Sequence, residues 1–139
     1  MNSKTTILLN KTVDNVNETC PTATLDIKEN IKNRDWTIKN YGYGPLNPDY
    51  PDIGFWEKKA DLWNSDIDTV KTAKCGNCAA FDQTSKIISC MIEGINETKL
   101  ADPYDVQQHA NLGYCQLFKF KCAATRTCDA WLHGGPIID

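Results

Sequence analysis

The clearest hydrophobic pattern of the chain lies between Phe55 and Lys74, in the stretch FWEKKADLWNSDIDTVKTAK. Its apolar side chains recur at alternating steps of four and three residues, at Trp56, Ala60, Trp63, Ile67 and Val70. Charged and amide side chains fill the positions between them. This spacing predicts one amphipathic helix, with the two tryptophans anchored in a core rather than lining a ligand site.

Three other segments have weaker signals of regular structure. Residues 26–34, DIKENIKNR, are interpreted as a short helix, and residues 85–95, SKIISCMIEGI, as a buried helix or strand. Residues 102–113 have start and stop signals of a helix. Asp102 suits an N-cap, Pro103 suits the first turn, and Gly113 suits the C-terminal end. That helix would end two residues before Cys115.

Two segments have patterns that favour irregular structure. Residues 1–26 are rich in Thr and Asn and poor in apolar side chains, which predicts an extended N-terminal arm with Cys20 as a free thiol. Residues 40–52, NYGYGPLNPDYPD, hold three prolines and three tyrosines and predict a loop. The loop and the arm are candidate contacts for partner subunits, and a plain connector is the alternative for the loop.

Length and charge narrow the class of protein. A chain of 139 residues predicts one domain, here residues 27–139, with a helical part at 27–73 and a cysteine-rich part at 74–135. The net charge of −3 argues against nucleic-acid binding, and no apolar run is long enough to cross a membrane. We find no signal-peptide pattern, so we expect a protein that is made and kept in a cytoplasm.

The cysteines carry the candidate chemistry. Six of the seven lie between Cys75 and Cys128, and in a reducing compartment such a group favours metal ligation over disulfides. Only Cys75 and Cys78 form a Cys-x-x-Cys unit, on a turn that Gly76 and Asn77 suit. The later cysteines are isolated in sequence. Isolated ligands fit a [4Fe-4S] cubane, which takes one thiolate at each iron, better than a zinc site built from two paired turns.

Aromatic side chains surround these cysteines. The following residues lie within three positions of a candidate ligand and are expected to shield a cluster from water: Phe81, Tyr114, Phe118, Phe120 and Trp131. No Cys-x-His unit, HExxH motif, phosphate-binding loop or nucleophile elbow is present, so we do not expect an enzyme.

The order CGNCAAF, GYCQLF and TCDAW resembles the high-potential iron–sulfur proteins, over about residues 74–135. The resemblance implies a [4Fe-4S] cluster with Cys75, Cys78, Cys115 and Cys128 as ligands, and soluble one-electron transfer as an activity. The chain departs from that family in its long gap between the second and third ligands and in the extra cysteines Cys90 and Cys122. Either extra cysteine is an alternative ligand, and a pair of buried thiols is the simpler interpretation.

The wider layout is similar to that of small virion-associated proteins of marine tailed phages, including cyanophages. The similarity rests on a YGYGP loop, the FWEKKADLW helix, CGNCAAF and a closing CDAW before Gly-Gly-Pro. It implies a structural component of a phage particle, assembled in the host cytoplasm and bound to other subunits. We therefore expect a small helical and irregular fold, not sheet-based, organised around a metal cluster. An electron carrier and a zinc-stapled interaction module are the alternatives.

Overall fold

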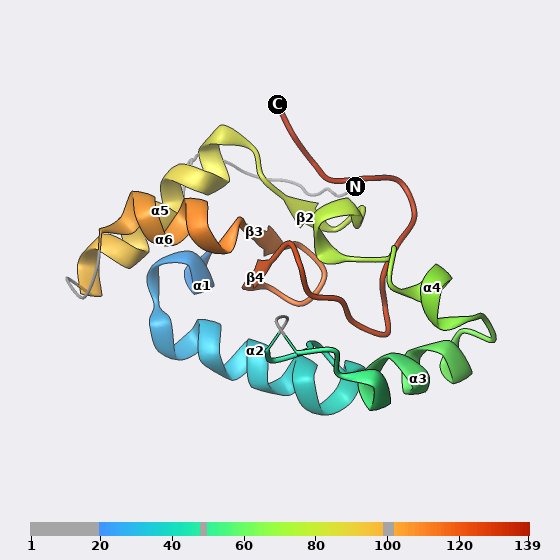
Figure 1. Ribbon diagram of the computed structural model, residues 1–139. Helices are drawn as coiled ribbons and strands as arrows, with labels where there is room; N and C mark the ends of the chain where they lie inside the picture. Colours follow the sequence, from blue (N-terminus) through green and yellow to red (C-terminus); the bar gives the residue numbers. More distant parts are fainter. Residues whose placement is uncertain (1–19, 48–49, 99–101) are drawn as a thin grey trace.

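A three-stranded antiparallel sheet lies at the centre of the computed structural model, which describes residues 20–47, 50–98 and 102–139 (Figure 1). The helices are α1 (Thr22–Leu25), α2 (Ile27–Tyr41), α3 (Ile53–Leu62), α4 (Ile67–Val70), α5 (Ser85–Thr98) and α6 (Pro103–Ala110). The strands are β2 (Phe81–Asp82), β3 (Leu112–Cys115) and β4 (Phe120–Ala123), and η1 (Cys75–Asn77) is a 3₁₀ turn.

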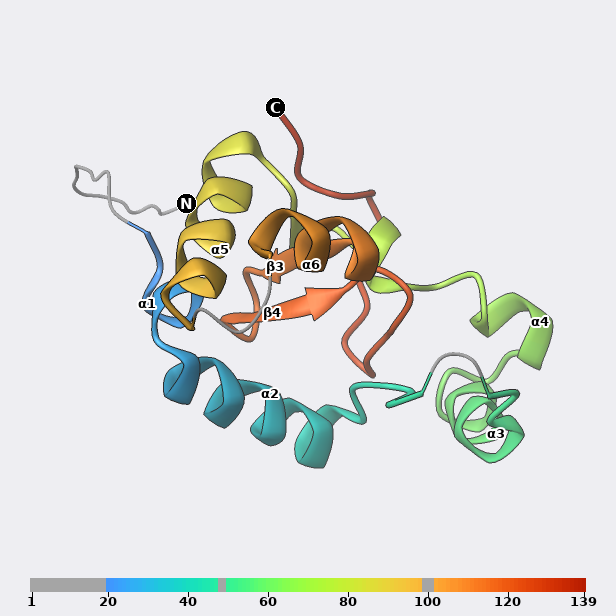
Figure 2. The same cartoon turned by 60° about the vertical axis from the view of Figure 1, so that its left-hand side comes forward.

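The sheet separates two groups of helices. In both views α2 runs along one side of it, while α5 and α6 lie together on the other (Figures 1 and 2). The strand order is β2-β3-β4, with Phe81 opposite Cys115 and Gly113 opposite Cys122. A Cβ atom on Gly113 would come within 2.4 Å of the Phe81 ring, so the residue expected to stop a helix is needed for strand packing instead.

The sheet corrects the expected fold class. The fold is small and rich in helices as predicted, but it is a mixed α/β fold rather than a helical and irregular one. The strands have two, four and four residues, which is too short to show an alternating apolar pattern in sequence. The sheet matters for the site because β3 and β4 each carry a cysteine.

The predicted amphipathic helix is broken into α3 and α4. The helix ends at Leu62, Asn64 adopts a left-handed backbone angle (φ 51°), and Asp66 caps the next helix by accepting a hydrogen bond from the N–H of Thr69. The side chains of the predicted face nevertheless pack in one cluster with Phe55: Trp56, Ala60, Trp63, Ile67 and Val70. The pattern of burial was therefore predicted correctly, and the continuity of the helix was not.

The other predicted helices are present, but their C-terminal ends differ from the prediction. Asp26 caps α2, which runs on to Tyr41 and stops at Gly42 (φ 58°), well beyond the predicted end at residue 34. Asp102 caps α6 as predicted, but Asn111 (φ 47°) ends it. Residues 85–95 belong to α5, which settles the choice between helix and strand.

A disulfide joins Cys20 to Cys90, with 5.5 Å between their Cα atoms, which corrects two predictions. Cys20 is not a free thiol, and Cys90 is neither a free thiol nor available as a metal ligand. The pairing arises because α1 packs closely against α5: a Cβ atom on Gly94 would lie only 1.8 Å from the Thr24 carbonyl oxygen. No local pattern links residues 70 positions apart.

The predicted N-terminal arm is only partly described. Residues 1–19 lie outside the described part of the chain. Residues 20–26 are not an extended arm, because they contain α1 and the buried side chains of Ala23 and Thr24. Ala23 packs with Ile87, Met91 and Tyr114 in a core cluster on the α5 side of the sheet. Within the described residues, no helix has both the length and the apolarity to span a bilayer.

Candidate metal centre

Five free cysteines line a single cavity between the sheet, η1 and the loop that follows α2. They are Cys75, Cys78, Cys115, Cys122 and Cys128, and we call the space that they line the thiol cavity. The empty volume is about 320 Å³, part of it open to solvent. The structure thus brings together the four cysteines predicted as ligands and Cys122, from segments that are far apart in sequence.

Cys75 and Cys78 lie on the η1 turn, which is held against the end of β4. The N–H of Cys75 donates to the Arg126 carbonyl (2.6 Å), and the N–H of Gly76 donates to the Ala124 carbonyl (2.9 Å). A Cβ atom on Gly76 would lie 3.0 Å from the Ala124 side chain. Gly76 therefore permits close approach of the turn to β4, whereas the sequence had suggested a need for unusual backbone angles.

The other three thiols come from the sheet and the segment after it. Cys115 ends β3, Cys122 lies in β4, and Cys128 follows the strand by five residues. Thr127 fixes the position of Cys128, because its N–H and carbonyl form a two-way bridge with Gly44. The loop after α2 thus holds one predicted ligand in place.

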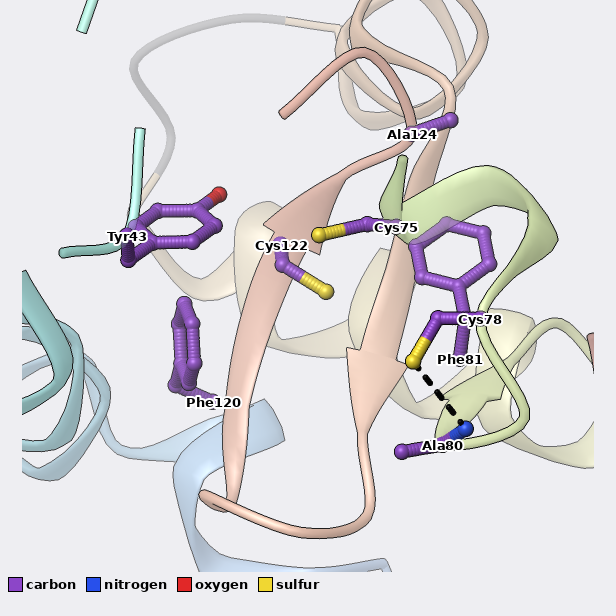
Figure 3. Packing of buried hydrophobic residues seen from close by; sticks show 8 residues of the cluster. All are labelled: Tyr43, Cys75, Cys78, Ala80, Phe81, Phe120, Cys122 and Ala124. Carbon is purple, nitrogen blue, oxygen red and sulfur yellow. Dashed lines mark hydrogen bonds between the residues drawn. The ribbon is translucent and has the colours of Figure 1, made fainter. Parts of the chain in front are cut away.

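Backbone N–H groups point at two of the sulfur atoms. The Sγ of Cys78 accepts hydrogen bonds from Ala80 (3.5 Å; Figure 3) and Leu132 (3.4 Å), and the Sγ of Cys115 accepts one from Phe118 (3.3 Å). Such donors favour a negatively charged sulfur, as a metal-bound thiolate is. These contacts orient the two side chains before any metal binds.

Burial contributes to a raised pKa at three of the thiols, Cys115, Cys122 and Cys128. It raises the pKa of Cys128 to about 12 and raises the pKa of Cys115, and the N–H groups of Phe118 and Leu117 oppose the shift at Cys115. A hydrogen bond with Cys75 and then burial raise the pKa of Cys122 well above its usual range. A thiol with a raised pKa is protonated at neutral pH, so a metal that binds its sulfur displaces the proton into solvent.

Aromatic rings form most of the remaining wall. Four of the five predicted shielding residues line the cavity: Phe81, Phe118, Phe120 and Trp131. Tyr114 does not, because its alternate position on β3 directs it into the cluster with Met91 on the α5 side. The wall is apolar, as a site that excludes water from an inorganic cluster needs to be.

Tyr43 is a wall residue that the sequence analysis missed. Its ring packs edge-on against Phe120, with 4.8 Å between centroids (Figure 3), and its hydroxyl accepts a hydrogen bond from the N–H of Ala123 (3.1 Å). Tyr43 precedes the first cavity cysteine by 32 residues, so proximity in sequence did not indicate it. Its place between Gly42 and Gly44, in the tyrosine-rich loop, is the only local signal.

The donors that line the cavity are all thiols. Among the described residues, no three His, Cys, Asp or Glu side chains are arranged to hold one metal ion. A zinc ion needs four donors about 2.3 Å away, which brings the sulfurs close together around one point. A cubane takes one thiolate at each corner and suits sulfurs that are spread around a larger space. The all-thiol, apolar lining fits that group.

No family model, curated protein or solved structure matches the chain.

Proposed function

We propose that the protein is an iron–sulfur protein whose thiol cavity holds a [4Fe-4S] cluster on Cys75, Cys78, Cys115 and Cys128. The observation that carries the proposal is the convergence of free thiols from η1, β3 and the segment after β4 on one apolar cavity. When bound, the cluster would supply a covalent link among these segments and a centre that can exchange one electron.

The chain's own residues would hold the cluster in place and keep water from it. The N–H groups of Ala80, Leu132 and Phe118 stabilise charge on the ligand sulfurs. Phe81, Phe120 and Tyr43 are almost fully buried and close the inner wall. Since the cluster binds only the folded chain, its binding free energy adds to the free energy of unfolding.

We further propose that the cluster serves as a structural link in an assembly component, of the kind found in tailed-phage particles. Exposed apolar side chains that lie near one another in sequence support a role in subunit contacts, because grouped apolar surface marks interaction sites. Leu46 and Tyr50 of the tyrosine-rich loop are 63% and 69% exposed, and Ile53, which begins α3 just after that loop, is 58% exposed. Leu46 and Tyr50 lie in the loop that the sequence analysis proposed as a partner contact.

One observation favours the alternative, a soluble one-electron carrier. Phe118 of the cavity wall contacts Tyr41 (4.7 Å between centroids) and Trp36 (5.9 Å), and about half of the Trp36 surface is exposed. This aromatic contact connects the cavity to the outer face of α2. Two results together would favour the carrier over the assembly role. Voltammetry would show a reversible one-electron couple, and mass spectrometry of purified phage particles would not detect the protein.

The proposal is tested by metal analysis of protein purified without air. Iron and acid-labile sulfide in equal amounts, with a broad visible absorption band, are expected for the cubane. Zinc without sulfide would contradict it and favour the zinc-stapled module.

Cysteine substitutions test the choice of ligands. We expect Cys→Ser at position 75, 78, 115 or 128 to abolish iron binding and to reduce soluble yield, because each removes one corner ligand. Cys122 lines the same cavity, but the Cys122→Ser variant is expected to retain iron when it is measured by the same metal analysis. Loss of iron in Cys122→Ser, with retention in Cys115→Ser or Cys128→Ser, would transfer the ligand role to Cys122.

A further inference from the structure

Cys122 is a fifth thiol in a cavity whose proposed cluster needs four, and its partner is Cys75. Figure 3 shows the sulfur atoms of the two residues side by side in the thiol cavity, which both residues line. Both residues are buried, with 9% of Cys75 and 2% of Cys122 exposed. The two sulfur atoms are therefore largely shielded from solvent.

The backbone fixes this pair. Cys75 lies on η1 and Cys122 on β4, and the two elements are joined by the hydrogen bonds from Cys75 to Arg126 and from Gly76 to Ala124. The close approach at Gly76 leaves no room for the turn to move toward the strand. The two sulfurs thus stay within reach of each other while the sheet is folded.

The molecule already contains one pair of oxidised cysteines. The Cys20–Cys90 disulfide lies on the α5 side of the sheet, and the five thiols of the cavity are reduced. When the Cys20–Cys90 disulfide forms, the chain is exposed to an oxidant, and the five cavity thiols are exposed to the same oxidant. Their fate under that oxidant depends on what fills the cavity.

We propose that Cys75 and Cys122 form a second disulfide when the cavity is empty, and that this bond blocks metal loading. The first half stands on the geometry of the pair. The second half rests on the proposed function, in which Cys75 is a ligand. It also predicts an order of maturation, with the cluster inserted before the chain meets the oxidant that closes Cys20–Cys90.

Hydrogen peroxide is a small neutral oxidant that balances the reaction. The Cys75 sulfur, which is the more exposed, attacks one peroxide oxygen, and the O–O bond breaks to give a sulfenic acid and water. The Cys122 sulfur then attacks the Cys75 sulfur, the S–O bond breaks, and the hydroxyl of the sulfenic acid leaves as a second water with the Cys122 thiol proton. Two electrons pass from the sulfur pair to peroxide overall.

The test uses full-length protein that is metal-free, with Cys20–Cys90 intact and the other cysteines reduced. After treatment with peroxide, peptide mapping by mass spectrometry under non-reducing conditions is expected to show a Cys75–Cys122 cross-link. Titration should show the loss of two of the five free thiols. Iron and sulfide uptake should then be lost and should return after treatment with a dithiol reductant.

Two variants complete the test. In Cys122→Ala the cross-link cannot form, so peroxide at the same dose should leave more iron uptake than in wild-type protein. Cys115→Ser keeps the pair and should still form the cross-link. A dominant cross-link between other cavity cysteines, or none, would overturn the first half. Full iron uptake by cross-linked protein would overturn the second half.

These outcomes are separable from failure of the proposed function. If reduced wild-type protein takes up no iron and sulfide at all, the cluster proposal fails while the cross-link is still read by mass spectrometry.

Discussion

Gly94 is the residue on which the packing of the N-terminal segment depends most directly. It lies in α5, where helix propensity alone would favour alanine by about 1 kcal/mol. Yet a Cβ atom there would meet the Thr24 carbonyl oxygen at 1.8 Å and the Leu25 Cα at 3.2 Å. Both contacts are with backbone, so they are relieved only if α1 moves away from α5.

We therefore expect Gly94→Ala to lower the free energy of unfolding by about 2 kcal/mol or more, since overpacking outweighs helix propensity. The measurement is urea unfolding followed by circular dichroism. Gly54→Ala in α3 is the matched control, because nothing lies within 4 Å of a Cβ atom there. The control should gain about 0.5 kcal/mol. Equal effects at the two positions would contradict the close contact.

Single residues were predictable from sequence where the signal is local. The cap Asp102 was found in this way, as were the cysteine spacing and the aromatic neighbours Phe81 and Phe118. Tyr43 and the pairing of Cys20 with Cys90 were not, because both depend on contacts between segments that only the folded chain brings together.

At the scale of elements, α3 is tied to the site by a buried ion pair. The Lys59 ammonium contacts the Asp129 carboxylate, donates to the Gly42 carbonyl (3.0 Å) and lies 4.7 Å from the centre of the Phe55 ring. Its side chain is 5% exposed, and Asp129 directly follows Cys128. One contact thus joins the end of α2, α3 and the last cavity cysteine.

Asp129→Ala should destabilise the protein by about 3 kcal/mol, because it leaves a buried ammonium without its carboxylate. Urea unfolding measures the effect. The double variant Lys59→Met/Asp129→Ala should recover most of the loss, since it removes the unpaired charge as well. A double variant that is no more stable than Asp129→Ala would show that the cost comes from packing, against this account.

The elements differ in how much of them the sequence specifies. The apolar positions between Trp56 and Val70 indicate the buried face, but a period of 3.6 residues cannot reveal the single left-handed residue, Asn64, that divides the helix. The strands β2, β3 and β4 are held by pairing with one another, and each is too short for a periodic signal. Long, patterned elements were predictable and short, partner-dependent ones were not.

At the scale of the whole molecule, the Cys20–Cys90 disulfide is a covalent link between residues 70 positions apart in sequence. Replacing both cysteines by alanine should lower the free energy of unfolding of the metal-free protein by about 2–4 kcal/mol, by the chain-entropy account. A reductant should lower the urea midpoint of wild-type protein and leave that of the double variant unchanged. A midpoint that falls equally in both would mean that the reductant acts elsewhere.

The whole fold also explains why the expected class of architecture was incomplete. The sequence pattern predicted a fold organised around a metal cluster. The structure supplies a second core cluster around Met91 and Tyr114 and a third around Trp56, each outside the thiol cavity. A centre in the cavity would then reinforce a chain that has other sources of stability, which sequence composition alone did not show.

Residues from both halves of the chain close the cavity, so the cysteine-rich half alone is not sufficient to transfer the site to another protein. Besides Tyr43 and the Gly44 bridge, Asn30 accepts from the N–H of Lys121 (2.6 Å) and Asn33 donates to the Lys119 carbonyl (2.6 Å). A peptide that begins at Lys74 and is grafted onto another scaffold would carry every cavity thiol, but it would lack the residues before Lys74 that help to close the cavity. A transplantable version has to include α2 and the loop behind it.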